Sequence, residues 1–298
     1  MKLTRTQFDL LVFFEMEKNE KNLTQRAIAR LTGHSVGTVN KTLVFFNENG
    51  LIKNNRISTE GLKILDPYRV KRAVFIAAGF GSRLVPISLN TPKPLVRVKG
   101  IRIIDTLIDA VYTAGIEEII IVRGYLGEQF DQLKYKYPRI QFLENPLYNE
   151  ANNISSLMCA RYLLQNAYVL ESDLLLKNPN LIAKYQYSSN YLGVFTDRTD
   201  DWCFETKGGI ISKIKVGGQN CHHMFGISYW TGNDGAKLAD HIKQVYEMPG
   251  GKERFWDLVP LEYFLKDYMV EVRECTFNDI IEIDTFNELK EIDETYRV

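Results

Sequence analysis

Long apolar runs, paired cysteines and a net charge are all missing from this chain of 298 residues. No stretch approaches the roughly 20 consecutive apolar residues that span a bilayer, so we expect no transmembrane helix and no membrane partner. The four cysteines are widely spaced and form no C-x-x-C pair, and the first residues lack an apolar secretory segment. Reduced thiols in a cytoplasmic protein are therefore expected.

The charge is balanced overall but not along the chain. Lysine plus arginine number 37, as do aspartate plus glutamate, so the whole chain has no general attraction for nucleic acids. Residues 1–72, however, hold 13 basic residues against 7 acidic ones, a net charge of +6 that leaves −6 for residues 73–298. With a linker expected at Asp66-Pro67-Tyr68, we predict a small basic domain at 1–68 and a larger acidic domain at 69–298.

The basic segment has the capping residues and apolar spacing of three short helices followed by a hairpin. The helices are expected at residues 4–18, from about 24 to 33 and from about 35 to 49, with β-like runs on either side of residues 53–55. This order is typical of a winged helix-turn-helix. The segment LTQRAIARLTGHSVGTVNKTLVFFNENGLI resembles the bacterial regulators of that type.

This resemblance implies a DNA-binding surface. In that family the third helix enters the major groove and the wing touches the backbone. Here the third helix would present Ser35, Thr38 and Lys41, and the wing Lys53 and Arg56. DNA is thus one predicted partner of this segment, and a dimerising appendage, which would make a homodimer, or a regulatory appendage is the alternative.

From Lys71 onward, strand-like and helix-like segments alternate. Strands are expected at 74–77, 118–122, 140–143 and 167–170, and helices at 103–114, 128–137 and 154–164. Alternation of this kind indicates βαβ units and predicts an α/β fold with a Rossmann-like, mainly parallel sheet covered on both faces. After about residue 190 the chain becomes β-rich, and Gly208-Gly209 and Gly217-Gly218 are expected to separate short strands that form a wall over the site.

The most informative segment is AVFIAAGFGSRLVPISLNTPKPLVR, at residues 73–97. A buried strand breaks into a loop that holds Gly79 and Gly81, then Arg83, and Lys93 follows between two prolines. Glycines after a strand let backbone N–H groups approach an oxyanion closely, while arginine and lysine add positive charge. This order predicts a triphosphate site at the carboxyl end of the first strand.

The string A-A-G-x-G-[ST]-R-L-x-P-x-[ST]-x-x-x-P-K-P-L, from Ala77 to Leu95, resembles the signature of the sugar-nucleotidyltransferase superfamily. Further motifs are G-Y-x-x-E-Q-F at 124–130, N-N-x-x-S-L at 152–157, a strand ending in Asp173 and E-I-D at 282–284. Over residues 72–296 the chain is most similar to the bacterial CTP:phosphocholine cytidylyltransferases. The resemblance implies that an acceptor phosphate attacks the α-phosphorus of CTP and expels pyrophosphate; the choice of CTP follows from the resemblance alone.

The resemblance also implies roles for particular residues. Nucleotide-binding roles fall to Ala77, Ala78, Gly79, Phe80, Gly81, Ser82, Arg83, Gly124 and Tyr125. Lys93, Arg83 and Asp173 would be catalytic, because two reacting anions need positive charge more than a general base. Asp173 and Asp284 match the family's Mg²⁺-binding carboxylates, and Mg²⁺ prefers oxygen ligands. Each aspartate also has a structural alternative, Asp173 as a strand end and Asp284 as a helix N-cap.

The aromatic residues of the second half suggest the acceptor. A quaternary ammonium donates no hydrogen bond, so aromatic faces and nearby negative charge recognise it. We predict that Trp202 and Trp256, with Tyr229 third, form such a cage, and that Asn153 also contacts the substrate. Packing in the core is the alternative for the aromatic residues.

The leading prediction is a Mg²⁺-dependent transferase that makes CDP-choline and pyrophosphate from CTP and phosphocholine. Phosphoethanolamine and 2-aminoethylphosphonate are alternative acceptors, whose primary ammonium would favour carboxylate partners, and a sugar 1-phosphate is a more distant one. A second class is a DNA-binding transcriptional regulator whose nucleotidyltransferase-like domain only senses a ligand.

Overall fold

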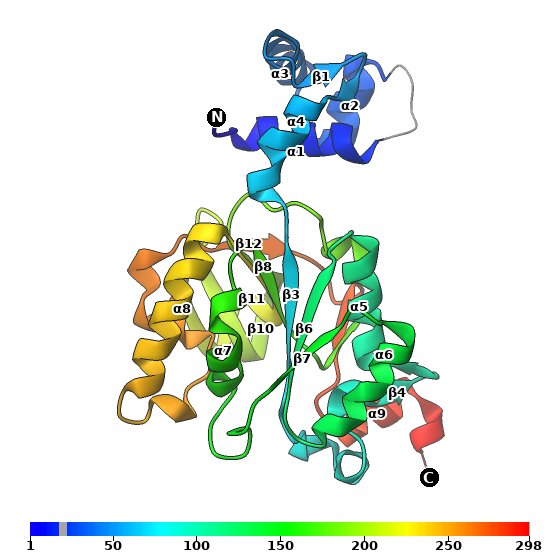
Figure 1. Ribbon diagram of the computed structural model, residues 1–298, viewed down its shortest axis with the longest axis vertical. Helices are drawn as coiled ribbons and strands as arrows, with labels where there is room; N and C mark the ends of the chain where they lie inside the picture. The colour runs from blue at the N-terminus through cyan, green and yellow to red at the C-terminus, as the bar shows by residue number, and fades with distance from the viewer. Residues whose placement is uncertain (18–22, 298) are drawn as a thin grey trace. The chain divides into compact units, whose positions relative to one another are not determined.

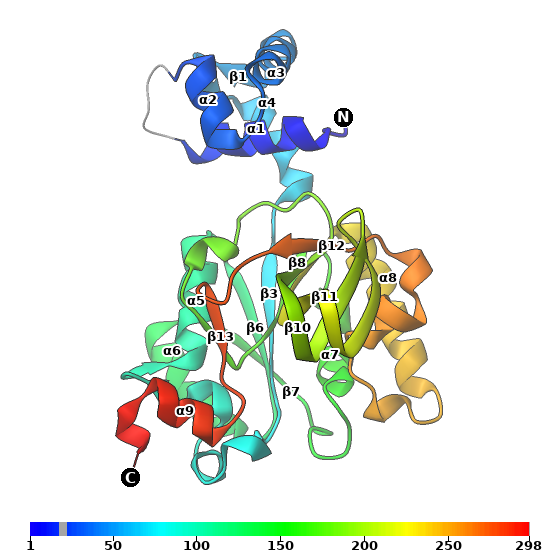
Figure 2. The same ribbon diagram turned by 180° about the vertical axis from the view of Figure 1, so that it is seen from behind.

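The computed structural model describes residues 1–17 and 23–297 (Figures 1 and 2). The chain divides into two compact units. The first comprises Met1–Arg69 and Tyr185–Tyr187, and the second comprises Val70–Lys184 and Ser188–Val298. Among the helices of the described residues, none is long and apolar enough to cross a lipid bilayer.

The first unit contains short helices and one small hairpin. Its elements are α1 (Arg5–Met16), α2 (Gln25–Thr32), α3 (Val36–Glu48), β1 (Ile52–Lys53), β2 (Arg56–Ile57) and α4 (Thr59–Leu65). The side chains of Thr4, Thr24 and Ser35 each accept a hydrogen bond from a backbone N–H in the first turn of the helix that follows, which satisfies donors that a helix start leaves unpaired. Residue 18, where the first helix was expected to end, lies outside the described residues.

Tyr185–Tyr187 belongs to the first unit because it packs among the unit's own aromatic side chains. The ring of Tyr187 stacks on Tyr68 at 5.7 Å and lies 5.4 Å from the ring of Phe8. Its hydroxyl donates to the carbonyl of Leu3 at 3.0 Å. Tyr68, expected in a linker, is therefore part of this aromatic cluster, since its ring has two partners there.

The second unit is built on a sheet of seven strands. They are β3 (Arg72–Ala77), β6 (Glu118–Arg123), β7 (Gln141–Glu144), β8 (Ala167–Glu171), β10 (Asn190–Lys207), β11 (Ile210–Trp230) and β12 (Glu271–Glu274), in the order β10-β12-β11-β8-β3-β6-β7. β3 runs parallel to β6 and β8, and β6 runs parallel to β7. β11 is antiparallel to both β8 and β10. The predicted α/β fold with a mainly parallel sheet is confirmed.

Helices cover both faces of this sheet (Figure 1). The main ones are α5 (Ile103–Thr113), α7 (Ile154–Ala160) and α8 (Gly232–Glu247). Successive side chains of β3 point to opposite faces: Phe75 packs in one cluster with Leu107 of α5, and Val74 packs in another with Ala160 of α7. Each strand near β3 is therefore apolar on both sides, as expected for a buried parallel sheet.

Two helices are shorter than expected. The segment at 128–137 forms a 3-10 helix, Gly127–Gln132, and then the single turn α6 (Leu133–Lys136). The helix expected at 154–164 ends as α7 at Ala160 and continues as the 3-10 turn Arg161–Leu163. In both places apolar spacing predicts which side is buried, but does not distinguish the tighter 3-10 turn from the α-helix.

The strands after residue 190 are longer than expected. Gly208-Gly209, both with positive φ, forms the turn between β10 and β11 as predicted. Gly217-Gly218 does not reverse the chain, because β11 continues through it to Trp230. β10 offers a pairing partner over this length, and the glycines fall near a register shift between Thr199 and Trp202. They accommodate a bulge in a long ribbon.

Smaller elements place the C-terminal segment beside the sheet. β9 (Leu174–Leu176) pairs antiparallel with β13 (Ile280–Glu282), so that Glu282 lies opposite Leu174. The hairpin of β4 (Arg97–Val98) and β5 (Ile101–Arg102) precedes α5, and α9 (Phe286–Ile292) follows β13. The pairing of β9 with β13 brings residues from the end of the chain next to the carboxyl end of β8.

Candidate active site

The glycine loop follows β3, and Asp173 follows β8. Because β3 and β8 are parallel neighbours, both lie at the same edge of the sheet. A cavity of about 580 Å³ opens there. The predicted site residues that line it are Ala77, Gly79, Gly81, Ser82, Arg83, Lys93, Asn153, Asp173, Trp202 and Asp284.

Gly81 allows the loop to pass close to Lys93. Its φ is +67°, in the left-handed region that favours glycine. A Cβ at this position would lie 3.1 Å from the Cβ of Lys93. The second glycine of the motif is thus needed both for the turn of the backbone and for the approach of the lysine.

Lys93 is buried and paired with two carboxylates. Its Nζ lies 2.7 Å from Oδ2 of Asp173 and 2.8 Å from Oδ1 of Asp284. Burial alone would lower the pKa of Lys93, but the charges and hydrogen bonds of the two aspartates outweigh it and raise the pKa. The lysine is therefore a fixed positive charge at the cavity wall.

Asp284 joins Lys93 to the second cation of the signature. Nη2 of Arg83, whose side chain is 66% exposed, lies 2.9 Å from the same Oδ1 of Asp284. The alternative role of Asp284 as a helix cap is wrong, because Thr285 is the N-cap of α9 and forms a capping box with Glu288. The carboxylate of Asp284 is thereby left to the two basic groups.

A group of three carboxylates lies beside this cluster. Glu171, Asp173 and Glu282 can place one oxygen each within 4.8 Å of the others. Burial, followed by repulsion from Asp173 and Asp284, raises the pKa of Glu282 to about 8. Burial, followed by repulsion from Asp257, Asp173 and Glu282, also raises the pKa of Glu171. Concentrated negative charge of this kind fits a hard divalent cation.

The orientation of Asp173 supports the same reading. Its Oδ2 bonds to Lys93, whereas its Oδ1 is buried with no hydrogen-bond partner among the described residues. The sequence predicts Asp173 and Asp284 as metal ligands, which stays a prediction, and the sequence analysis did not single out Glu171 and Glu282, which lie beside Asp173. Each missed glutamate lies two residues before a predicted aspartate, and alternate residues of an extended chain face the same side. That spacing is the signal that would have revealed them.

Aromatic and further acidic residues also line the cavity. Trp202 and Phe255 both line it, and their ring centroids are 5.5 Å apart. Asp257 lies beside them, is 4% exposed and accepts a hydrogen bond from the hydroxyl of Tyr191. Burial raises the pKa of Asp257 to about 6, against hydrogen bonds that lower it.

Two of the predicted cage residues do not reach this cavity. Trp256 is 1% exposed and packs against Tyr191 and Trp230 in the core. Tyr229 is 1% exposed on the opposite side of the sheet, and its hydroxyl donates to Asn166. The prediction is therefore corrected for both: Phe255, the neighbour of Trp256, occupies the place beside Trp202.

The remaining predicted residues make contacts that support the cavity or its surroundings. The side-chain oxygen of Asn153 accepts a hydrogen bond from the backbone N–H of Trp256 at 2.9 Å, which ties α7 to the segment that carries Phe255. Ala78, Phe80, Gly124 and Tyr125 do not line the cavity. The rings of Phe80 and Tyr125 instead pack edge to face at 4.7 Å.

Comparison with known proteins agrees with this geometry. The model of the nucleotidyl transferase family matches residues 72–199. A 2-aminoethylphosphonate cytidylyltransferase of Lancefieldella rimae is 35% identical over 228 residues, which are 75% of this chain and 92% of the relative. A choline-phosphate cytidylyltransferase of Streptococcus pneumoniae is 33% identical over 226 residues, 75% of this chain and 97% of that relative.

A solved structure supports the same assignment. The CTP:phosphocholine cytidylyltransferase from Streptococcus pneumoniae superposes with a TM-score of 0.71 at 32% identity, over 76% of this chain and 99% of that one. The fold and the cavity thus define a nucleotidyltransferase. More particularly, the chain belongs to the nucleotidyl transferase family and is similar to these bacterial cytidylyltransferases.

Proposed function

We propose that the protein transfers a cytidylyl group from CTP to a small phosphate or phosphonate that carries an ammonium group, such as phosphocholine or 2-aminoethylphosphonate. The observation that carries this proposal is one cavity whose lining combines two unlike sets of side chains. Arg83 and Lys93 are basic, whereas Trp202, Phe255 and Asp257 are aromatic or acidic. A zwitterion with a phosphate at one end and a cation at the other matches both.

The basic residues account for the transfer step. An acceptor phosphate is already ionised at neutral pH, so its oxygen attacks the α-phosphorus without a general base. The new P–O bond forms as the bond to pyrophosphate breaks, and Lys93 and Arg83 stabilise the charge on the oxygens. Mg²⁺ held by Glu171, Asp173 and Glu282 would supply further positive charge to the phosphates.

The aromatic and acidic residues account for the ammonium group. Trp202 and Phe255 line the cavity with aromatic rings, whose faces attract a cation, and Asp257 and Asp201 add negative charge to the lining. The relatives named for 2-aminoethylphosphonate and choline phosphate support an acceptor of this charge pattern.

The test is pyrophosphate release by the purified full-length protein with Mg²⁺. CTP should be compared with other nucleoside triphosphates, and phosphocholine with phosphoethanolamine, 2-aminoethylphosphonate and a sugar 1-phosphate. We expect the highest kcat/KM with CTP and an acceptor that carries an ammonium group. Turnover with the sugar phosphate alone would exclude the proposed acceptor class, and turnover with a primary amine alone would exclude the quaternary ammonium.

DNA binding by the first unit stays a separate prediction. Lys41, Lys53 and Arg56 are exposed on α3 and the hairpin of that unit. A gel shift on the DNA upstream of the gene, repeated over a range of salt concentrations, would test it. Weak binding that is independent of sequence and is lost with salt would contradict a regulator.

A further inference from the structure

The G-Y-x-x-E-Q-F motif has no contact with the cavity, yet it holds the signature segment at two points. The backbone N–H of Tyr125 donates to the carbonyl of Ala78 at 3.0 Å, where the glycine loop begins. The Tyr125 hydroxyl donates to the carbonyl of Leu89 at 3.2 Å. Nε2 of Gln129 donates to the carbonyl of Asn90 at 2.9 Å. These contacts join residues 124–129 to both ends of the segment between Ala78 and Asn90.

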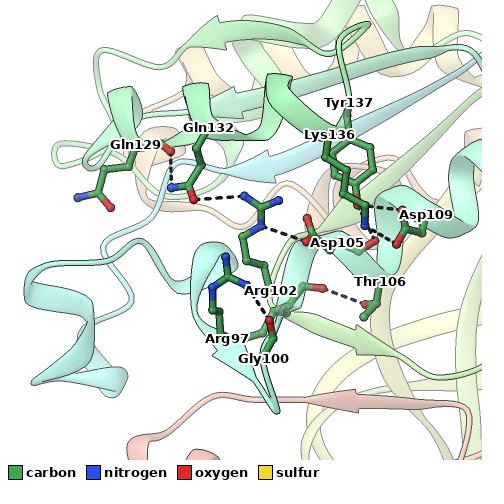
Figure 3. A network of polar contacts seen from close by, with 11 residues as sticks. Arg97, Gly100, Arg102, Asp105, Thr106, Asp109, Gln129, Gln132, Lys136 and Tyr137 are labelled. Carbon is green, nitrogen blue, oxygen red and sulfur yellow. Dashed lines mark hydrogen bonds and ion pairs between the residues drawn. The ribbon is translucent and has the colours of Figure 1, made fainter.

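A series of polar contacts holds the backbone of Gln129 in place (Figure 3). Nε2 of Gln132 donates to the backbone carbonyl of Gln129 at 2.9 Å, and Nη1 of Arg102 donates to Oε1 of Gln132 at 3.2 Å. Arg102 is itself paired with Asp105 of α5 at 3.0 Å, and both are buried. Figure 3 shows the side-chain amide of Gln129 pointing away from Gln132. The amide is thus carried by a network anchored in the core.

The segment from residue 85 to 92 is held partly by these contacts. Within it, Leu89 donates to the carbonyl of Pro86 and Asn90 to that of Ile87, each over a single turn and at 3.2 Å. Ile87 packs against an apolar cluster, but the side chain of Leu89 is 53% exposed. This segment connects Arg83 to Lys93. A shift in it would move both cations relative to each other.

We propose that Tyr125 and Gln129 are positioning residues that fix the phosphate-binding segment through the carbonyls of Leu89 and Asn90. Neither side chain touches substrate in this assignment. The link to catalysis rests on the proposed function, in which Arg83 and Lys93 bind the phosphates. Loss of the two side-chain hydrogen bonds should leave the fold intact and increase the motion of residues 85–92.

The test uses the double variant Tyr125→Phe/Gln129→Met in the full-length protein. Phenylalanine keeps the ring that packs on Phe80, and methionine keeps the length of glutamine without its donor. The matched control is Tyr135→Phe/Gln141→Met, which makes the same changes at exposed positions. Amide hydrogen exchange of residues 85–92 should accelerate about tenfold in the double variant only, a change within the range expected from losing the two side-chain hydrogen bonds.

Kinetics then separate positioning from simple stability. We expect kcat to fall about tenfold while KM for the acceptor changes less than twofold, at an unchanged melting temperature. Unchanged exchange in residues 85–92, or accelerated exchange with kcat within twofold of the unmodified protein, would overturn the proposal. If exchange accelerates but the unmodified protein transfers no nucleotide to any acceptor, the hold on the segment stands and the proposed function is what fails.

Discussion

Nζ of Lys93 lies 2.8 Å from Oδ1 of Asp284, the same oxygen that Arg83 approaches to 2.9 Å. One carboxylate oxygen therefore holds both cations of the signature at a fixed spacing, although Arg83 is largely exposed and Lys93 is buried. Charges oriented in advance need little rearrangement as negative charge develops on the phosphates. Asp284 is in this sense an orienting group for the two basic residues.

Replacement of Lys93 should abolish most of the activity. In Lys93→Ala we expect kcat to fall about 100-fold or more, the usual cost of removing one group that stabilises transition-state charge. In Asp173→Asn we expect kcat to fall by a similar factor, because the substitution weakens the ion pair with Lys93 and the binding of Mg²⁺. Pyrophosphate release measures both, with the exposed Lys213→Ala as the control. Near-normal rates in either site variant would remove that residue from the mechanism.

Trp202 and Trp256 should respond in opposite ways to the same substitution. Trp202→Ala should raise KM for the acceptor about tenfold, with little change for the nucleotide or in stability. Trp256→Ala should instead lower the free energy of unfolding by about 3–5 kcal/mol, because it empties a fully buried site. Steady-state kinetics and urea unfolding of the pair distinguish the two roles. Equal KM effects on both substrates in Trp202→Ala would contradict the ammonium site.

The cluster of Glu171, Asp173 and Glu282 should lower the stability of the metal-free protein and favour the binding of Mg²⁺. Glu282→Gln removes a group whose pKa is raised to about 8 by burial and by neighbouring carboxylates, so the metal-free variant should melt at a higher temperature than the unmodified protein. The rise in melting temperature on adding Mg²⁺ should be smaller in the variant. The exposed Glu294→Gln is the control. An equal Mg²⁺ shift in Glu282→Gln would place the cation elsewhere.

Asp257 should give the stability of the fold a measurable pH dependence. Its pKa of about 6 lies above the ordinary 3.8, so the folded protein binds this proton more tightly than the unfolded chain. The resulting stabilisation is present below pH 3.8 and is lost as the pH rises through 6, amounting to about 3 kcal/mol. In urea unfolding from pH 4 to 7, Asp257→Asn should therefore gain stability relative to the unmodified protein. Parallel pH curves would contradict this assignment.

The positions of the glycine loop and Asp173 could be predicted from the sequence because each follows a strand whose direction the βαβ pattern predicts. Lys93 lies in a 3-10 turn outside that pattern, and the signature motif indicated it. Asp284 lies far along the chain, and only the resemblance connected it to this place. The pairing of β9 with β13, which brings it there, has no local signal in either strand.

The aromatic residues of the cavity were predicted less well for a physical reason. Trp256 and Phe255 are neighbours in a turn, where no period of 2 or 3.6 indicates which side chain faces the cavity. Trp256 is the larger apolar surface and fills the core, which leaves Phe255 at the wall. At Tyr229 the alternation of the strand predicts that this residue and Trp230 face opposite sides of the sheet. Both faces of β11 are covered there, so each of the two side chains is buried on its own side.

Tyr187 is needed to complete the aromatic cluster around Phe8 and Tyr68, yet it is made only after more than half of the chain has been synthesised. On the ribosome that cluster therefore stays open while the first strands of the second unit emerge. The first unit is completed only when residues 185–187 have been made. A fragment that stops at residue 69 would keep this unfinished surface permanently, and an apolar ring without its cover is a place where chains associate.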